Sequence, residues 1–451
     1  MTRRDLLIGA AAGGLTLRLR GEDPAAYLPL AEVRPVLASF SGELPAELQG
    51  VSLTAGSWLA WETKRDQEIR ARLKRGDADS IFNLVLFGTS FTAQPRVTGG
   101  EEMGRVILAR VHDMAQAVRH PAGNERLQLV VEWLQANGED PAGPDAGKRV
   151  EVVLLENALR VRGEQRAYAE TIADAKQKGD AAGLFVTRSS LYRDRGLSLD
   201  TSFRPNFAIE RSLAEMKAAG VLREVRRAAV IGPGLDFADK RSGYDFYPMQ
   251  TLQPFALIDS LRKLRLAGPA GPAVEILDLS DRVLSHVRRA VARARLGAAY
   301  TLQVPLDGDT RWLPPTIDYW RGFGLEIGTE VKALRPPAGV EARMHAVRIR
   351  PGVVALLGAA DLDVVTEHMV LPEEQRFDLI VATNVLVYYG PFEQGLALRN
   401  IADMLRVGGV LLSNNALPDV DGVPMRAAGS SSVAYAEDPD DGDRVVWYRR
   451  G

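Results

Sequence analysis

Short apolar runs mark the carboxyl half of the chain. Ala228–Ile231, Val274–Leu277 and Phe377–Val381 are apolar at nearly every position, which is typical of strands that are buried on both faces of a parallel sheet. Amphipathic stretches separate these runs, as at Pro254–Leu266 and Arg282–Arg295, and their apolar residues recur at helical spacing. The alternation of buried strands with helices predicts an α/β fold with a parallel sheet.

Each apolar run ends in groups that could bind a ligand. The first run is followed by Gly232-Pro233-Gly234, the second by Asp278 and the third by Asn384. Open α/β sheets bind their ligands at the carboxyl ends of the strands. We therefore expect these residues to share one cleft.

The amino half shows a different pattern. Apolar residues follow helical spacing over Leu59–Lys74, Arg105–Arg119, Glu125–Ala136 and Val150–Lys178, and Gly76 is expected to end the first of these helices. The pattern predicts a mainly α domain over residues 21–224, followed by a second domain over residues 225–451. No stretch of the predicted helical domain shows a motif that carries chemistry.

Composition restricts the function further. The 451 residues are 46% hydrophobic and 25% charged, with a formal net charge of −2, so the chain is globular and no nucleic-acid partner is expected. There is no cysteine, and the five histidines are scattered without the spacing of a ligand pair. We expect no metal site.

The amino terminus carries a possible leader over residues 1–20. Thr2-Arg3-Arg4-Asp5-Leu6-Leu7 resembles the S/T-R-R-x-F/L-L pattern of twin-arginine export signals, and a short apolar run follows it. That run is shorter than the ~20 apolar residues that span a bilayer, so no transmembrane segment is expected. A frayed basic leader or a misassigned start is the alternative interpretation.

The three apolar runs, together with the residues that follow each of them, resemble motifs of the class I S-adenosylmethionine-dependent methyltransferases. Phe377–Tyr389 is similar in detail to the R-N-V-L-I-Y-F segment of the chemotaxis-receptor glutamate methyltransferases, although Thr383 stands where those enzymes have arginine. Val407-Gly408-Gly409 resembles the family's R-P-G-G turn, and Ser432–Ala436 could pair with Arg444–Arg449 as a hairpin. The resemblance implies a Rossmann-like doubly wound sheet with an antiparallel last strand.

The family resemblance also implies S-adenosyl-L-methionine as the cofactor and a set of binding residues. Gly232 and Gly234 would leave room for its methionine and ribose portions, and the Asp278 carboxylate would accept both ribose hydroxyls. Asp236 could replace the acidic residue that the family places two positions before the first glycine, where this chain has Val230. Asn384, which follows the third apolar run, is expected to contact the cofactor.

Two turns resemble the family's adenine-reading turn. One is Gly358–Asp361, and the other is Glu367-His368-Met369, which closes the strand-like run Leu362–Thr366. We favour the second turn, because it lies one short loop ahead of the next strand. Glu367 and His368 are thus predicted to bind the cofactor.

The predicted activity is methyl transfer to a small-molecule or protein acceptor. Tyr388 and Tyr389 are the candidates for orienting that acceptor, because they follow Asn384 closely. A non-catalytic scaffold that keeps the fold is the alternative. A nicotinamide oxidoreductase is disfavoured, because Phe237 stands where the dinucleotide fingerprint needs its third glycine.

The compartment follows from weighing two signals. S-adenosylmethionine is made in the cytoplasm, and several separated motifs indicate a methyltransferase, whereas the export signal is one short leader. We therefore expect a cytoplasmic protein, with twin-arginine export or tethering at the membrane as the alternative.

Overall fold

The computed structural model describes most of the chain. The described residues are 17–20, 23–97, 102–143, 146–177, 196–198, 200–238, 244–306, 311–438 and 441–451. The twin-arginine pattern at Thr2–Leu7 lies outside them. Residues 17–20, which were assigned to the leader, form strand β1 (Leu17–Arg20) and pair with β2 (Asp23–Tyr27).

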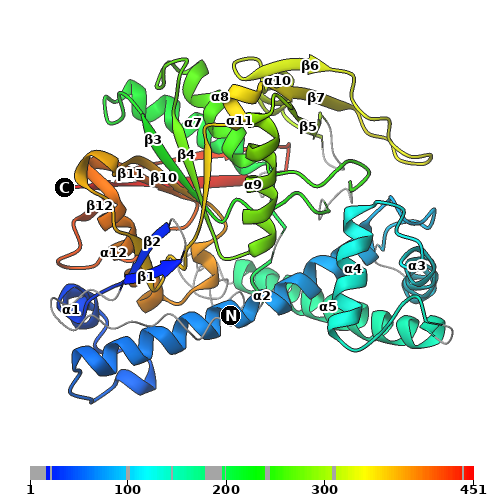
Figure 1. Ribbon diagram of the computed structural model, residues 1–451, viewed down its shortest axis with the longest axis horizontal. Coiled ribbons are helices and arrows are strands. Elements are labelled where there is room, and N and C mark those ends of the chain that lie inside the picture. The colour runs from blue at the N-terminus through cyan, green and yellow to red at the C-terminus, as the bar shows by residue number, and fades with distance from the viewer. Residues whose placement is uncertain are drawn as a thin grey trace.

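A seven-stranded sheet forms the centre of the carboxyl half (Figure 1). Its strand order is β12-β13-β11-β10-β3-β4-β8. The five strands from β11 to β8 are parallel, whereas β13 runs antiparallel to both β11 and β12. The strands are β3 (Arg227–Ile231), β4 (Ala273–Asp278), β8 (Leu357–Asp361), β10 (Phe377–Ala382), β11 (Leu405–Ser413), β12 (Met425–Ala434) and β13 (Gly442–Arg450).

Both faces of this sheet are covered by helices. Ala228 and Val230 of β3 point into a core shared with α7 (Pro205–Ala218), α8 (Gln253–Lys263) and α9 (Asp281–Arg295). Ala229 and Ile231 point into a second core that contains α12 (Pro391–Met404) and α1 (Leu30–Ser39). The alternation follows from the two-residue period of a strand, and the predicted doubly wound fold is confirmed.

The third parallel strand differs from the expected one. Residues Leu362–Thr366, predicted as a strand, form a turn, and β8 just before them pairs with β4. Glu367–Met369 is the short strand β9, which pairs with β2 in a separate three-stranded sheet. The strand was predicted because residues 362–366 are mostly apolar. In the structure the apolar side chains of this turn pack in the second core.

A further antiparallel sheet extends the fold in the order β5-β7-β6. Its strands are β5 (Tyr300–Pro305), β6 (Gly328–Val331) and β7 (Met344–Ile349). The remaining short elements are α10 (Pro314–Gly322), α11 (Pro351–Val354), η1 (Ala46–Leu48), η2 (Glu373–Gln375) and η3 (Leu386–Tyr388).

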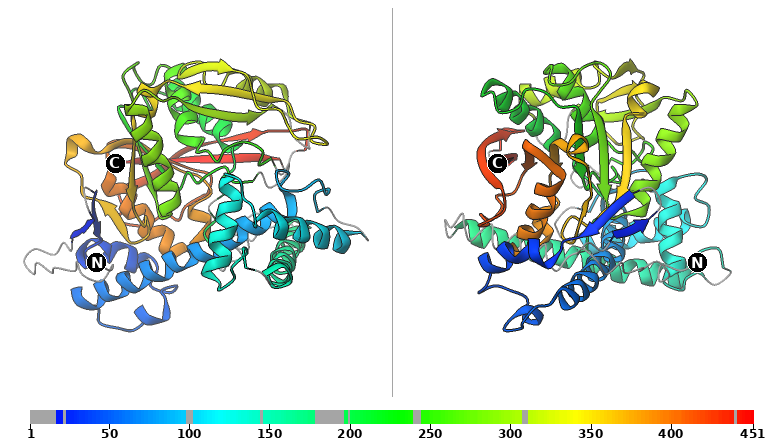
Figure 2. Two further views of the ribbon diagram at one scale, coloured as in Figure 1. Left: turned by 45° about the vertical axis from the view of Figure 1, so that its right-hand side comes forward. Right: turned by 60° about the vertical axis from the view of Figure 1, so that its left-hand side comes forward.

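The amino half is mainly α, as predicted. Its long helices are α2 (Ala55–Phe87), α3 (Met103–Ala117), α4 (Glu125–Ala136) and α5 (Ala146–Gln177). Helix α2 passes below the sheet in every view (Figures 1 and 2). Its first half, with Trp58 and Ile69, packs in the second core, and its second half, from Ala78 to Leu86, packs in the first core.

Gly76 does not end α2, contrary to the prediction. The helix continues for 33 residues, and a Cβ on Gly76 would lie 1.8 Å from the carbonyl oxygen of Leu197. Likewise, a Cβ on Gly196 would lie 2.1 Å from the Gly76 nitrogen. The two glycines therefore let the backbone at 196–198 cross the middle of α2 in direct contact.

A substitution at this crossing should destabilise the protein. We expect Gly76→Ala to lower the free energy of unfolding by roughly 1–3 kcal/mol, the usual cost of overpacking, despite the better helix propensity of alanine. The matched control is Gly163→Ala, at an exposed position of α5 with open space around the added Cβ. That change should raise stability by about 0.5–1 kcal/mol. Urea unfolding curves measure both, and equal effects would contradict the crossing.

Candidate functional site

A cavity of about 610 Å³ opens at the carboxyl ends of the parallel strands. Its sheet side consists of Gly232 and Gly234 after β3, Asp278 at the end of β4, and Asn384 after β10. Four of the residues predicted from separate motifs thus line one cavity. Tyr388 and Tyr389 line it as well.

The cavity lies at the point where the sheet changes its direction of winding. Strands β3 and β10 are neighbours, but the helices that follow them, α8 and α12, cover opposite faces. The loops after the two strands therefore diverge and leave a crevice, which is where doubly wound sheets bind ligands. A Cβ on Gly232 would lie 2.7 Å from Val385 Cγ2, so the two loops approach closely at the base of the crevice.

Gly232 and Gly234 adopt backbone conformations that favour glycine. Their φ angles are +61° and +63°, in the left-handed region that residues with a Cβ rarely adopt. The turn brings backbone rather than side chains to the cavity wall. A ligand can therefore approach the main chain directly.

Asp278 is 8% exposed and faces both the turn and the cavity. Its Oδ1 accepts a hydrogen bond of 2.7 Å from the Ser280 amide. Burial raises the pKa of Asp278 to about 6, against the effect of the backbone N–H groups of Ser280 and Gly234. At neutral pH the carboxylate is ionised and can accept hydroxyl hydrogen bonds.

Asn384 has a left-handed conformation with φ of +59°. Its backbone N–H donates to Asn414 Oδ1 at 2.8 Å, and Asn414 Nδ2 donates to its Oδ1 at 2.6 Å. This reciprocal pair fixes the side chain at the cavity mouth. Asparagine is among the few residues that tolerate this conformation.

Tyr388 and Tyr389 differ in their surroundings. Residues Leu386–Tyr388 form the 3₁₀ turn η3, and α12 begins only at Pro391. Tyr389 is 2% exposed, and burial raises the pKa of its phenol well above the usual value. It therefore stays protonated, so it can donate a hydrogen bond but cannot act as a base. Tyr388 is only partly buried.

Three predicted site residues lie away from the cavity wall. The Asp236 carboxylate accepts hydrogen bonds of 2.9 Å from Tyr247 Oη and from Gln250 Nε2, because the chain turns its side chain away from the crevice. Glu367 and His368 belong to β9, in the separate sheet. The expectation that Glu367 joins the other residues in the cleft is wrong, since its carboxylate pairs with Arg70 at 3.2 Å.

The alternative turn, Gly358–Asp361, is not a turn but part of strand β8, which ends beside the cavity. Asp361 pairs in register with Asp278, and Leu362 and Val364 line the cavity. The Asp361 carboxylate forms an ion pair of 2.6 Å with Arg70, which also binds Asp66 at 2.6 Å. Arg70 thus joins the middle of α2 to the carboxyl end of β8.

The outer wall of the cavity consists of segments that were not predicted to belong to the site. Helix α2 contributes one face, with Leu73, Asp77, Asn83 and Phe87 at helical spacing. Residues 196–198 and 200–205, helix α5 and the β12–β13 hairpin also contribute to the wall. The only signal in the sequence was the presence of polar residues within an apolar stretch of α2, since buried polar groups require a partner or a function.

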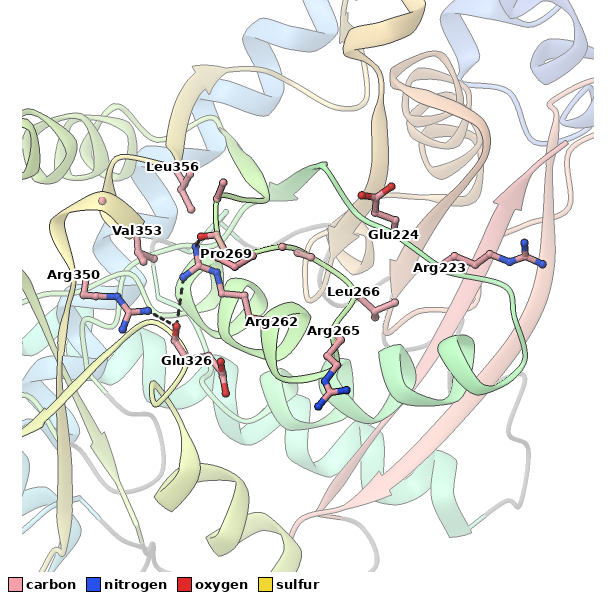
Figure 3. Close-up of a pocket in the computed structure, with 14 residues that line it drawn as sticks. Arg223, Glu224, Arg262, Arg265, Leu266, Pro269, Glu326, Arg350, Val353 and Leu356 are labelled. Carbon is pink, nitrogen blue, oxygen red and sulfur yellow. Dashed lines mark hydrogen bonds between the residues drawn. The ribbon is translucent and has the colours of Figure 1, made fainter.

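A larger hollow, of about 880 Å³, lies at the opposite ends of the strands. Its lining comes from the segments that precede β3, β4 and β8, and it includes Arg262 and Arg350. Both guanidinium groups donate to the Glu326 carbonyl (Figure 3). These arginines hold loops together, and no motif residue faces the hollow, so we place the functional site at the carboxyl ends.

In the part of the chain that the structure describes, no cluster of three or more histidine, aspartate or glutamate side chains is arranged to hold a metal ion. No helix among these residues has the length and apolarity that a membrane crossing requires.

Comparisons with known proteins give only distant likenesses. No protein-family model matches the chain, and no curated protein matches it. TrmN from Thermus thermophilus is 13% identical with a TM-score of 0.26, and the match covers 55% of this chain and 52% of TrmN. The chain thus aligns with about half the length of TrmN.

Two further solved structures are similar at the same level. The glycopeptide N-methyltransferase MtfA is 13% identical over 56% of this chain and 75% of its own, with a TM-score of 0.23. A TehB-like SAM-dependent methyltransferase from Corynebacterium glutamicum is 12% identical over 53% and 86%, with a TM-score of 0.23. At these scores the fold class rests on the strand order and directions given above, and the likeness to chemotaxis-receptor enzymes stays a prediction.

The buried acids beside the site should make stability depend on pH. Burial raises the pKa of Asp363 to about 8. The folded state therefore holds a proton that the unfolded chain releases above pH ~4, and this contribution to stability is lost as the pH rises through about 8. We expect the free energy of unfolding to fall between about pH 4 and pH 8, and Asp363→Asn to reduce that slope.

The control is Asp419→Asn, at a side chain that is 83% exposed, and it should leave the slope as it is in the wild type. Urea titrations at several pH values measure the slopes. Parallel curves for the wild type and Asp363→Asn would contradict the assignment.

Proposed function

We propose that the chain is a methyltransferase that uses S-adenosyl-L-methionine. One observation carries the proposal: Gly232, Gly234, Asp278 and Asn384, which come from three separate motifs, line one cavity at the switch point of a doubly wound sheet. The acceptor is a small molecule or a protein. The cytoplasm, where the donor is made, is the proposed site of action.

The residues present fit this cofactor. The cavity of about 610 Å³ lies within the range of 300–1,000 Å³ typical of small-molecule sites. The turn at Gly232–Gly234 would hold the methionine portion against the main chain, and the Asp278 carboxylate would accept the ribose hydroxyls. Leu362 and Val364 offer an apolar surface for the adenine.

The cofactor supplies a methyl group that its positive sulfur has already activated. The task of the protein is therefore to hold an acceptor in line and to exclude water, which accounts for much of the rate of such reactions. Tyr389 can donate a hydrogen bond to the acceptor, and Tyr388 can orient it from the same turn. A non-catalytic scaffold with the same fold remains the competing function, and ligand binding separates the two.

Titration calorimetry with S-adenosylhomocysteine tests the proposal. We expect saturable binding to one site, and Gly234→Val should weaken it roughly 10- to 100-fold, because the new side chain would enter the cavity. The control is Gly220→Val, which carries the same backbone strain, with φ of +69°, at a position with open space. The control should lose stability but keep its affinity. Absence of binding by the wild type would favour the scaffold.

The affinity for S-adenosylhomocysteine should also depend on pH. Hydroxyl groups bind the ionised form of Asp278, whose pKa burial raises to about 6. Affinity should therefore be constant above about pH 7 and fall by up to about tenfold per unit below pH 6. Asp278→Asn should bind weakly with a flat profile. An unchanged pH profile in this variant would show that another group is responsible.

A further inference from the structure

The hollow of about 880 Å³ at the amino ends of the strands is lined by four arginines. They come from the segment before β3, from α8 and the loop that follows it, and from the residue after β7 (Figure 3). They are Arg223, Arg262, Arg265 and Arg350. The fold thus gathers positive charge in one hollow from parts of the chain that are distant in sequence.

The hydrogen bonds of the two central arginines go to backbone carbonyl groups. Arg262 donates to the carbonyl oxygens of Pro269 at 2.8 Å, Gly271 at 3.2 Å and Glu326 at 3.4 Å. Arg350 donates to the same Glu326 carbonyl. None of the four lining guanidinium groups forms an ion pair with a carboxylate of the described residues. The carbonyl groups satisfy some of the donors, but they do not neutralise the charge.

Arg262 and Arg350 bring two like charges close together. Their guanidinium groups reach the Glu326 carbonyl oxygen from α8 and from the end of β7 (Figure 3). Burial lowers the pKa of Arg262 and the charge of Arg350 lowers it further, against the opposing effect of the Asp259 and Glu326 carboxylates. An anion that contacts both guanidinium groups would replace this repulsion by attraction.

Two carboxylates line the same hollow. Glu224 pairs at 2.8 Å with Arg226, which does not line it. The Glu326 side chain is exposed and pairs with no cation of the described residues. Neither carboxylate therefore occupies the space between Arg262 and Arg350 as a partner of both.

Apolar side chains form another part of the lining. Leu266 is 1% exposed and Val353 is 3% exposed, and the partly buried Leu356 lies near them in the lining with Pro269. Covering such side chains with an organic group is favourable, because it removes apolar surface from water. The hollow thus offers an apolar surface beside a pair of cations.

We propose that this hollow binds a small organic molecule that carries a phosphate group, with the phosphate held by Arg262 and Arg350 and the organic part against the apolar side chains. A phosphate monoester has a charge of about −1.5 to −2 and three acceptor oxygens, so it can bridge two guanidinium groups. A guanidinium has more N–H donors than either arginine uses here. The site goes beyond the proposed function and does not depend on it.

Calorimetric titration of the full chain with phenyl phosphate tests this inference. We expect saturable binding to one site, with an affinity that falls as salt is added, both with and without S-adenosylhomocysteine. Phenol lacks the charge and should not bind. Inorganic phosphate lacks the apolar ring and benzoate carries a single charge, so both should bind more weakly than phenyl phosphate.

Three arginine variants locate the binding. Arg350→Gln and Arg265→Gln should each weaken phenyl phosphate binding roughly three- to tenfold, because each removes a positive charge from the lining. The Arg265 side chain forms no hydrogen bond or ion pair with the described residues, so its replacement should leave the fold intact. The matched control is Arg211→Gln, an exposed position of α7 that does not line the hollow, and it should leave the affinity unchanged.

Several results would overturn the inference. They are the absence of phenyl phosphate binding, equal binding of phenol, and equal affinities of the Arg265→Gln and Arg211→Gln variants. Loss of phenyl phosphate binding when S-adenosylhomocysteine is added would place the phosphate in the other cavity, against the inference. Sedimentation with phosphatidylglycerol vesicles without binding of phenyl phosphate would show that the arginines contact a membrane surface instead.

Discussion

The architecture depends on one continuous helix that packs in two hydrophobic cores. Helix α2 has 33 residues, about 50 Å of helix, and its two halves pack against opposite sides of the molecule. Its middle therefore has to cross the carboxyl ends of the sheet without filling the crevice. Gly76 allows the crossing with residues 196–198, and Arg70 fixes the helix to Asp361 at the end of β8. The cavity is the space that remains between helix and sheet.

Ion pairs stabilise the carboxylates that are buried near this junction. Burial of carboxylates is costly unless cations or hydrogen bonds compensate for it. Near β8 the compensation is internal, because Arg70 binds Asp66, Asp361 and Glu367 together. In the cavity wall Arg204 pairs with Asp441, and Arg160 pairs with Asp79 and Glu164. Both groups of ion pairs join segments that are distant in the sequence.

The sequence predicted the parts that follow local rules. Three buried strands, their terminal groups and the helix α4, Glu125–Ala136, were identified because periodicity and turn chemistry are visible within a dozen residues. The strand beside β4 was misplaced, because an apolar run such as Leu362–Thr366 packs equally well as a strand or as a buried turn. Gly76 was taken as a helix end for a similar reason: glycine marks both helix ends and close crossings, and only the position of Leu197 distinguishes them.

The two sides of the cavity differ in how far apart their residues lie in the sequence. The sheet side is built from turns that directly follow strands, so its residues have fixed spacing from the apolar runs. The outer wall brings together residues as distant in sequence as Asp77, Asp200 and Asp443, and no local pattern links them. Changes in α2, in residues 200–205 or in the β12–β13 hairpin can therefore alter the outer wall while the strand ends keep their geometry. The motifs at the strand ends thus predict the sheet side of the cavity but not its outer wall.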